Sequence, residues 1–449
     1  MATSMSSCRS LANTVKAFRN KINILQENIP NSKFTFKNSH CAIDLPSDGQ
    51  IRRLHSCLHT LPHRHHHHHF RHGSRHLRHH IPSGRGSASK LCCPKPQNFQ
   101  CHQFFPRIPF SSSSNPSDLK EGSQSEIDPY KLVLPELTFL MPNICKKLNV
   151  DIPQMQHMAQ MYFGKGKAYR PMVAMLMAKA CNVHCRMGDS VLESQKIVAM
   201  VSEMVHTSSL VHDDVVDGAD TRRGMPSVNK TFGQRKAILT GDYILSQATI
   251  ALARTGNPHV ISLLATVIED LICGEFMQLG SKEDENERFQ HYLKKTYKKT
   301  ASLIANTCKS VATLCDNEDE DVVDVAFEYG RNLGMAFQLV DDMLDFVSSQ
   351  QTLGKPAAAD LKLGLATAPV LFAAIEHREL QPMIMRRFSE EGDVEYARAM
   401  VEKSDGIGQT RMLASQHSTE AVKKISQLSP SPARDALITV AKASLERKT

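Results

Sequence analysis

Residues 210–217, Leu-Val-His-Asp-Asp-Val-Val-Asp, place three carboxylates in a stretch that otherwise has the pattern of a buried helix. Apolar side chains before them recur at the i, i+3, i+4 spacing of one helix face, which predicts a helix over residues 191–211. Asp213 and Asp217 are four residues apart and share one face of such a helix, with Asp214 beside them. Carboxylates among apolar residues lose hydration, which is costly unless a positive charge pairs with them. The stretch is therefore either a solvated acidic helix end or a cation site.

The same spacing of carboxylates recurs in residues 339–346, Leu-Val-Asp-Asp-Met-Leu-Asp-Phe, at Asp341, Asp342 and Asp345. Two such triplets on separate helices can face each other and hold hard cations. Mg²⁺ takes oxygen ligands in octahedral geometry and is usually shared between carboxylates and substrate phosphates. The repeat therefore favours a magnesium–phosphate site over a solvated patch.

Apolar residues with helical periodicity occupy most of the chain after residue 126. The strongest runs are residues 172–180, 191–211, 237–253, 260–276, 302–314, 322–346 and 366–375. Neither a convincing strand alternation nor a Gly-x-Gly-x-x-Gly motif accompanies them. The sequence predicts an all-α domain over residues 118–449, a bundle of roughly ten helices joined by short loops.

Residues 1–117 form a different region, a basic leader. They hold 16 Lys and Arg residues against three Asp and Glu, whereas the full chain carries a formal charge of only +8. The basic charge therefore belongs to the leader, and we expect no nucleic-acid partner for the domain. An amphipathic, basic, Ser-rich and acid-poor start is typical of a mitochondrial presequence, which predicts the mitochondrial matrix. No apolar run reaches about 18 residues, so we expect no transmembrane segment.

The leader also contains an almost continuous histidine tract at residues 63–80. Such a tract is either an opportunistic metal binder or low-complexity sequence without fixed structure. Six of the 12 cysteines lie in the leader, and the other six show no paired spacing. The sequence therefore predicts neither a zinc site nor a disulfide framework, which suits a reducing compartment.

Basic residues near the acidic stretches are candidates for holding phosphate. Lys167 and Arg170 lie three apart in a Gly-rich segment that precedes a helix, an arrangement that can bind phosphate. Arg222 and Arg223 follow the first triplet by five residues, and adjacent guanidinium groups in a loop can contact two different phosphates. Each pair has an ordinary alternative as a solvated surface pair. Further candidates near the triplets are His206, Lys299, Thr300 and Lys355.

Taken in order, these motifs resemble the trans-isoprenyl diphosphate synthase family, whose members elongate prenyl chains with isopentenyl diphosphate. The resemblance extends from Tyr130 to the C-terminus. Its motifs are Gly-Lys-x-x-Arg-Pro at 166–171, Leu-x-His-Asp-Asp-x-x-Asp at 210–217, Arg-Arg-Gly at 222–224, Gly-Asp at 241–242, Gly-Glu-x-x-Gln at 274–278, Lys-Thr at 299–300 and Phe-Gln-x-x-Asp-Asp-x-x-Asp at 337–345. The resemblance implies an isoprenoid synthase-type helical bundle with a central catalytic cavity. It is strongest to the mitochondrial polyprenyl synthases that make the ubiquinone side chain.

The resemblance also implies a role for each matching residue. Mg²⁺ ions, three per site in this family, bridge the carboxylates and the allylic diphosphate, which is farnesyl or geranylgeranyl diphosphate. The implied metal ligands are Asp213, Asp214, Asp217, Asp341, Asp342 and Asp345. The implied allylic diphosphate site consists of Arg222, Lys299, Thr300, Gln338 and Lys355. The implied isopentenyl diphosphate site consists of Lys167, Arg170, His206 and Arg223. The residues implied to act in catalysis are Asp213, Asp214, Asp217, Arg222, Lys299, Asp341 and Asp342.

Two small residues before the first triplet bear on product length. Short-chain members of the family close the product tunnel with bulky aromatic residues at the positions of Ser208 and Ser209. Small side chains at these positions predict a long product, beyond four isoprene units. The alternative interpretation is that the serines only permit close helix packing.

The resemblance also bears on partners. Many bacterial members carry lysine at the position of Leu365, and animal members work with a related second subunit whose acidic triplets are incomplete. We therefore expect a hetero-oligomer in which this chain carries the chemistry. Two alternatives remain open at this point: a non-catalytic or regulatory subunit, and a class I terpene cyclase.

Overall fold

The computed structural model describes residues 127–163, 166–279, 285–315, 320–347 and 358–447. All of them belong to one compact unit within Pro96–Thr449. The predicted presequence, the histidine tract, the domain boundary at residues 117–118 and Lys355 lie outside the described residues and stay predictions.

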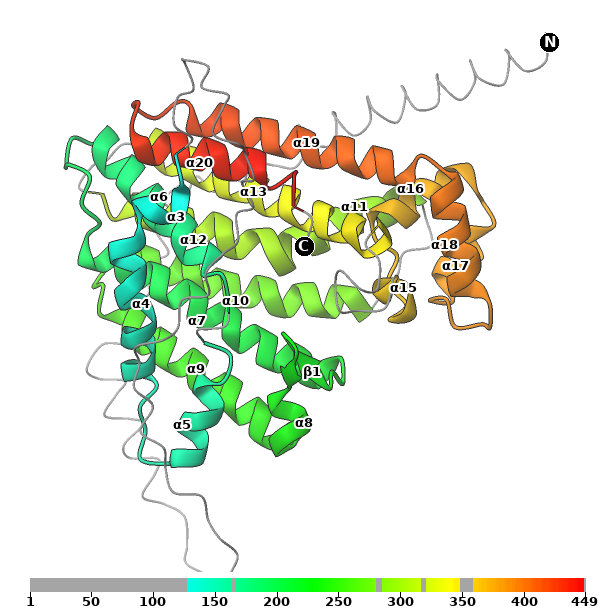
Figure 1. The fold of residues 1–449 in the computed structure, drawn as a ribbon, viewed down its shortest axis with the longest axis horizontal. Coiled ribbons are helices and arrows are strands. Elements are labelled where there is room, and N and C mark those ends of the chain that lie inside the picture. The colour runs from blue at the N-terminus through cyan, green and yellow to red at the C-terminus, as the bar shows by residue number, and fades with distance from the viewer. Residues whose placement is uncertain (1–126, 164–165, 280–284, 316–319, 348–357, 448–449) are drawn as a thin grey trace, which may run out of the picture. The chain divides into compact units, whose positions relative to one another are not determined.

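The described chain is helical almost throughout (Figure 1). Its first half contains α3 (Pro129–Leu132), α4 (Leu134–Lys147), α5 (Pro153–Gln160), α6 (Tyr169–His184), α7 (Glu193–Val216), β1 (Thr221–Arg222), β2 (Met225–Pro226), α8 (Val228–Phe232), α9 (Gln234–Ala253) and α10 (Pro258–Leu279). Its second half contains α11 (Glu285–Thr296), the π-helix η1 (Tyr297–Ala301), α12 (Ser302–Thr313), α13 (Glu320–Val347), α15 (Ala359–Lys362), α16 (Ala368–Glu376), α17 (Leu380–Met385), α18 (Asp393–Lys403), α19 (Gly406–Ile425) and α20 (Pro432–Ala443).

The predicted all-α class is confirmed, and each apolar run identified in the sequence falls in a helix. α6 and α12 lie in the core, since most of their side chains are buried and none is exposed. Helices that are apolar on all sides are expected in such central positions. α7 and α13, which carry the two acidic triplets, pack against this pair. No helix within the described ranges is both long and apolar enough to cross a membrane.

α7 carries the first triplet, as predicted. The apolar run ends at residue 211, and the helix continues through the first two aspartates to Val216, with Asp217 as its C-cap. A helix can retain a buried carboxylate when a cation pairs with it. Asp214 is such a carboxylate, because Arg222 contacts it directly.

A short antiparallel hairpin follows the first triplet and was not predicted. β1 and β2 pair Thr221 with Pro226 and Arg222 with Met225. The two turn residues, Arg223 and Gly224, have φ of +52° and +73°, as a two-residue type I′ turn requires. Strands of two residues are too short to show an alternating pattern. The turn directs the side chains of the two adjacent arginines to different parts of the site.

Candidate active site

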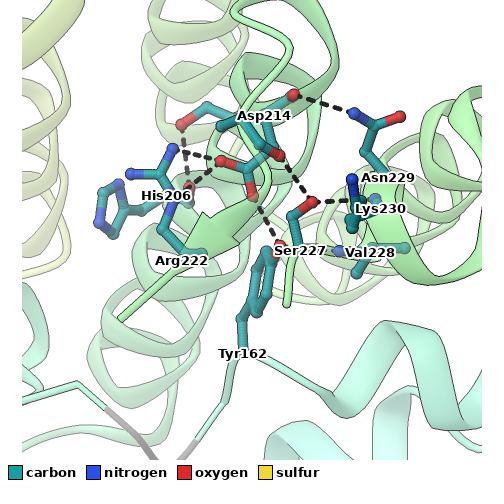
Figure 2. Close-up of polar contacts among 10 residues, drawn as sticks. Tyr162, His206, Asp214, Arg222, Ser227, Val228, Asn229 and Lys230 are labelled. Atoms are coloured by element: carbon teal, nitrogen blue, oxygen red, sulfur yellow. Dashed lines mark hydrogen bonds and ion pairs between the residues drawn. The ribbon is translucent and has the colours of Figure 1, made fainter. Parts of the chain in front are cut away.

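The middle aspartate of the first triplet is fully paired within the protein. Asp214 is 0% exposed, and its Oδ2 accepts a hydrogen bond from Tyr162 Oη at 2.6 Å. Its Oδ1 accepts one from Arg222 Nε at 2.8 Å and also contacts Arg222 Nη2. Figure 2 shows Tyr162 and Arg222 approaching this carboxylate from separate segments. Both oxygens of Asp214 are therefore occupied by protein donors.

The two flanking aspartates differ from Asp214. Within the described ranges, the side-chain carboxylates of Asp213 and Asp217 accept no hydrogen bond and form no ion pair. Partial burial raises the pKa of Asp213 to about 6; Lys299 opposes this shift and Glu275 adds to it. Burial and Glu275 also raise the pKa of Asp217, and Lys299 again opposes the shift. These carboxylates lack a counter-charge in contact, so a bound cation would stabilise their ionised forms.

The middle aspartate of the second triplet is held in the same way as Asp214. Asp342 is 3% exposed; its Oδ2 accepts a hydrogen bond from Tyr292 Oη at 2.5 Å and its Oδ1 one from Gln338 Nε2 at 2.8 Å. Burial raises its pKa to about 6. Thr300 Oγ1 donates to Gln338 Oε1 at 2.8 Å. The structure thus brings together Thr300, Gln338 and Asp342, three of the residues singled out in the sequence.

The outer aspartates of the second triplet also have protein partners. Asp341 Oδ1 pairs with Arg447 Nη2 at 2.9 Å, near the end of the chain. Asp345 accepts hydrogen bonds from the backbone N–H groups of Ala359 at 3.1 Å and Asp360 at 3.2 Å. Asp345 therefore holds the first turn of α15 against the end of α13.

Lys299 is held in place by two residues of α10. Its Nζ lies 2.5 Å from Glu275 Oε2 and 2.9 Å from Gln278 Oε1, both on α10. Gly274 permits this approach, because an added Cβ would lie 2.7 Å from Lys299 Cγ. Lys299 lies in the π-helix η1, an irregularity that is often found at functional sites. Its charge acts on both Asp213 and Asp217, so it lies beside the first triplet.

A second cationic group surrounds His206. Burial lowers the pKa of the His206 imidazole well below its usual range, and the charges of Arg170 and Arg223 lower it further. Glu203 is 5% exposed; burial raises the pKa of its carboxyl, against the influence of the same two arginines. The Arg223 guanidinium lies against Gly166, where an added Cβ would be 2.9 Å from Nη1. Three of the four residues predicted for isopentenyl diphosphate are therefore neighbours, and the fourth, the exposed Lys167, precedes α6.

The two serines before the first triplet face protein groups. Ser208 is 2% exposed, and its Oγ donates to the Gly241 carbonyl on α9 at 2.8 Å. Ser209 is half-buried and donates to the carbonyl of His206 at 2.9 Å. The contact of Ser208 with α9 fits the packing interpretation, while the role of both serines in product length stays a prediction.

Sequence reasoning missed several residues of the site. Tyr162 and Tyr292 carried no signal, since their partners are 52 and 50 residues away in the chain. Arg447 lies 106 residues from its partner, Asp341. Glu203 was detectable in principle, because it lies three residues before His206 and so shares its helix face.

The donor set fits Mg²⁺ that is shared with a substrate. Among the described residues, no three His, Cys, Asp or Glu side chains are close enough to hold a metal ion by themselves. Mg²⁺ commonly takes one or two carboxylates and completes its shell with water and substrate phosphates. Asp213 and Asp217, one turn apart and without protein donors, match that requirement. Lys299 and Arg222 lie near these carboxylates and are candidate cations for substrate phosphates.

Two acidic triplets with basic side chains near them, inside an all-α bundle, are the features that an enzyme acting on diphosphates needs. The family model described as polyprenyl synthetase matches residues 152–401, more than half of the chain. The chain therefore belongs to the polyprenyl synthetase family, as its motifs predicted, and is a prenyltransferase.

Two relatives and one solved structure narrow the class. The all trans-polyprenyl-diphosphate synthase of Homo sapiens is 53% identical over 343 residues, covering 76% of this chain and 82% of the relative. The probable mitochondrial hexaprenyl pyrophosphate synthase of Neurospora crassa is 42% identical over 368 residues, which cover 72% of this chain and 82% of the relative. The solved structure is a polyprenyl synthase from Caulobacter crescentus CB15 in complex with calcium and isoprenyl diphosphate. It is 28% identical to this chain with a TM-score of 0.65, and the match covers 72% of this chain and 97% of the other. The chain is a synthase of the long-chain polyprenyl diphosphate class.

Proposed function

We propose that this chain elongates farnesyl or geranylgeranyl diphosphate by repeated condensation with isopentenyl diphosphate, and so supplies the ubiquinone side chain. One observation supports the proposal that this chain is itself catalytic. Asp213 and Asp217 are carboxylates without protein donors in the described structure, and they lie beside Arg222 and Lys299. A non-catalytic subunit has no need of such an arrangement, because unpaired carboxylates reduce stability.

The carboxylates divide into those that bind metal and those that hold the site. Asp213, Asp217 and Asp341 are the proposed Mg²⁺ ligands, with three ions per site as in the family. Asp214 and Asp342 have both oxygens occupied by protein donors, and we assign them to orientation. Mg²⁺ supplies neutralisation of the charge that develops on the leaving diphosphate.

Arg222 and Lys299 hold the allylic diphosphate with their remaining donors. Arg222 uses Nε and Nη2 on Asp214, which leaves Nη1 for a phosphate oxygen. Lys299 uses two of its three N–H donors on Glu275 and Gln278. Thr300, Gln338 and Lys355 complete this proposed subsite.

Isopentenyl diphosphate is assigned to the cluster of Arg170, Arg223, His206 and Lys167. Arg170 Nε is buried and has no hydrogen-bond partner in the described part of the chain. The double bond of this substrate attacks C1 of the allylic chain while the C1–O bond to diphosphate breaks. A proton is then lost to the departing diphosphate. No protein nucleophile is needed, since orientation and electrostatic stabilisation account for the reaction.

We also propose a hetero-oligomer in the mitochondrial matrix. The leader composition and the mitochondrial relative from Neurospora crassa support the compartment. Ile272 and Phe276 support subunit packing, because they lie one turn apart on α10 and are 55% and 73% exposed. Apolar side chains that are exposed together on one helix face can mark an interface.

The proposed long product is tested at the two serines. If Ser208 and Ser209 leave the product path open, Ser209→Tyr shortens the product, as does Ser208→Tyr in protein that still folds. If they serve only helix packing, Ser208→Tyr lowers the melting temperature by breaking the contact with Gly241, and neither variant alters product length. Chromatography of the products separates the two results.

The central experiment measures incorporation of labelled isopentenyl diphosphate. The full chain is incubated with Mg²⁺ and farnesyl diphosphate, with and without a co-purified second subunit. Long polyprenyl diphosphates should form and should disappear in Asp213→Ala, while Asp189→Ala, an exposed aspartate between α6 and α7, keeps full activity. Incorporation that requires the second subunit establishes the hetero-oligomer. Absence of product in both conditions, with folded protein, favours the regulatory alternative.

A further inference from the structure

The middle carboxylate of each acidic triplet is held by a tyrosine that is distant in sequence. Tyr162 donates to Asp214 at 2.6 Å, and Tyr292 donates to Asp342 at 2.5 Å. All four side chains are buried, with exposed fractions of 3% or less. Tyr162 follows α5 and Tyr292 lies in α11, so the two contacts are built from unrelated segments. The same contact at two independent places indicates a shared role.

The direction of each hydrogen bond is fixed by its surroundings. The backbone N–H of Val228 donates to Tyr162 Oη at 3.0 Å (Figure 2). Since an amide N–H can only donate, the Tyr162 proton points to Asp214. Tyr292 donates to Asp342, because the ionised carboxylate can only accept. Burial raises the pKa of both phenols, so both retain their protons at neutral pH.

These hydrogen bonds set the orientation of the neighbouring carboxylates. Successive residues of an α-helix point about 100° apart, whereas residues four apart share a face. Anchoring Asp214 to Tyr162 and Arg222 therefore leaves Asp213 and Asp217 together on a different face. Asp214 itself already accepts three hydrogen bonds from protein donors, so it is the least available of the three carboxylates for a cation.

We propose that Tyr162 and Tyr292 are matched positioning residues of the metal–diphosphate site. Each holds the middle carboxylate away from the metals and thereby presents the proposed ligands beside it, which are Asp213 and Asp217 in the first triplet and Asp341 in the second. The inference rests on the proposed function, in which Asp213, Asp217 and Asp341 bind Mg²⁺.

A third buried tyrosine provides a matched control. Tyr329 is 0% exposed, and its Oη donates to the Leu437 carbonyl at 2.8 Å. It lies on α13, 12 residues before Asp341, which is about 18 Å along the helix axis. Tyr329→Phe removes a buried hydroxyl hydrogen bond without touching either triplet.

The experiment compares Tyr162→Phe, Tyr292→Phe and Tyr329→Phe in the full chain. Binding of Mg²⁺ with inorganic pyrophosphate is measured by calorimetry, and turnover is measured over a range of Mg²⁺ concentrations. Loss of a group that orients a metal ligand typically lowers metal affinity about 10–100-fold. We expect this loss for Tyr162→Phe and Tyr292→Phe, with turnover restored by excess Mg²⁺, and wild-type affinity for Tyr329→Phe.

The possible outcomes separate the inference from the proposed function. If both site variants bind Mg²⁺–pyrophosphate as wild type does, while losing as much thermal stability as Tyr329→Phe, the tyrosines are structural only and the inference is wrong. If only one of the two variants has wild-type affinity for Mg²⁺–pyrophosphate, the tyrosine replaced in it is not a positioning residue, and the proposal that the two tyrosines have the same role is wrong. If the wild-type chain does not bind Mg²⁺–pyrophosphate, the proposed function fails as well. Phe fills the space of Tyr, so loss of folding in one variant leaves the other as the test.

Discussion

The ends of α7 and α13 carry the same spacing of aspartates in different surroundings. At the end of α7 only Asp214 has protein donors in the described structure, whereas Asp213 and Asp217 have none. At the end of α13 all three aspartates are engaged, by Arg447, by Tyr292 with Gln338, and by the backbone of α15. The first triplet therefore has two carboxylates without protein donors, whereas every carboxylate of the second triplet is bound by other parts of the fold.

This difference shows that a repeated motif does not fix a repeated role. An aspartate that accepts two backbone N–H bonds, such as Asp345, serves a helix start in the manner of an N-cap. Asp217, at the same place in the first triplet, is the exposed C-cap of α7 and has its carboxylate free for a cation. The comparison predicts unequal effects for substitutions at matching positions.

The largest stability difference is expected between the neighbours Asp214 and Asp213. Asp214→Ala leaves the Arg222 charge without a partner and the Tyr162 O–H without an acceptor, and breaking a buried ion pair typically costs about 3–5 kcal/mol. Asp213→Ala removes no hydrogen bond or ion pair of the side chain, so it should leave the free energy of unfolding unchanged or raised. Urea denaturation of both variants without Mg²⁺ checks this; equal destabilisation contradicts the division of the triplet.

The next effect compares Asp217 with Asp345 in turnover. Loss of one electrostatic contact to a developing charge typically lowers kcat about 10²–10³-fold, which we expect for Asp217→Asn. Asp345→Asn keeps a side-chain oxygen for the N–H groups of α15, and Asn caps helices about as well as Asp, so a loss below about tenfold is expected. Steady-state kinetics at saturating Mg²⁺ measures both. If kcat falls by a similar factor in both variants, Asp217 and Asp345 have equivalent roles and the two triplets do not differ in the way proposed.

Local sequence patterns accounted for most helices and for the identity of the acidic residues. Periodicity located α7 and α13 because their apolar faces are long, and the predicted family followed from the order of the motifs. The hairpin at Arg222 and the π-helix at Lys299 were missed, since neither two-residue strands nor one extra residue in a helix alters periodicity enough to be seen.

The sequence also could not predict which aspartates of each triplet have protein partners. It depends on contacts such as Tyr162 with Asp214 and Arg447 with Asp341, which the folded chain makes across 52 and 106 residues. No local pattern distinguishes an aspartate with such a partner from one without.

A smaller effect concerns the pH dependence of stability at Asp213. Its folded pKa of about 6 lies above the ordinary value of 3.8, so folding favours the protonated form. Wild type should therefore be less stable than Asp213→Asn at pH 8, by about 1–3 kcal/mol. The difference should shrink as pH falls from about 6 towards 4, where the wild-type carboxyl gains its proton. Denaturation of both proteins without Mg²⁺ from pH 8 to pH 4.5 measures it; a difference independent of pH contradicts the raised pKa.

The smallest expected effect concerns the ion pair between Arg447 and Asp341 of the second triplet. Arg447 pairs with Asp341 and stacks over the Phe337 ring at 3.8 Å, and a partly exposed pair of this kind typically contributes about 0–1 kcal/mol. Because Arg447 competes with a cation for Asp341, Arg447→Gln should strengthen Mg²⁺–pyrophosphate binding, by up to about fivefold for 1 kcal/mol. Arg434→Gln, which breaks a similar pair with Asp435 at the start of α20, is the matched control and should leave binding unchanged. Weaker binding in Arg447→Gln indicates instead that the arginine contacts the diphosphate, and the second triplet is then held by its ligand as well as by the fold.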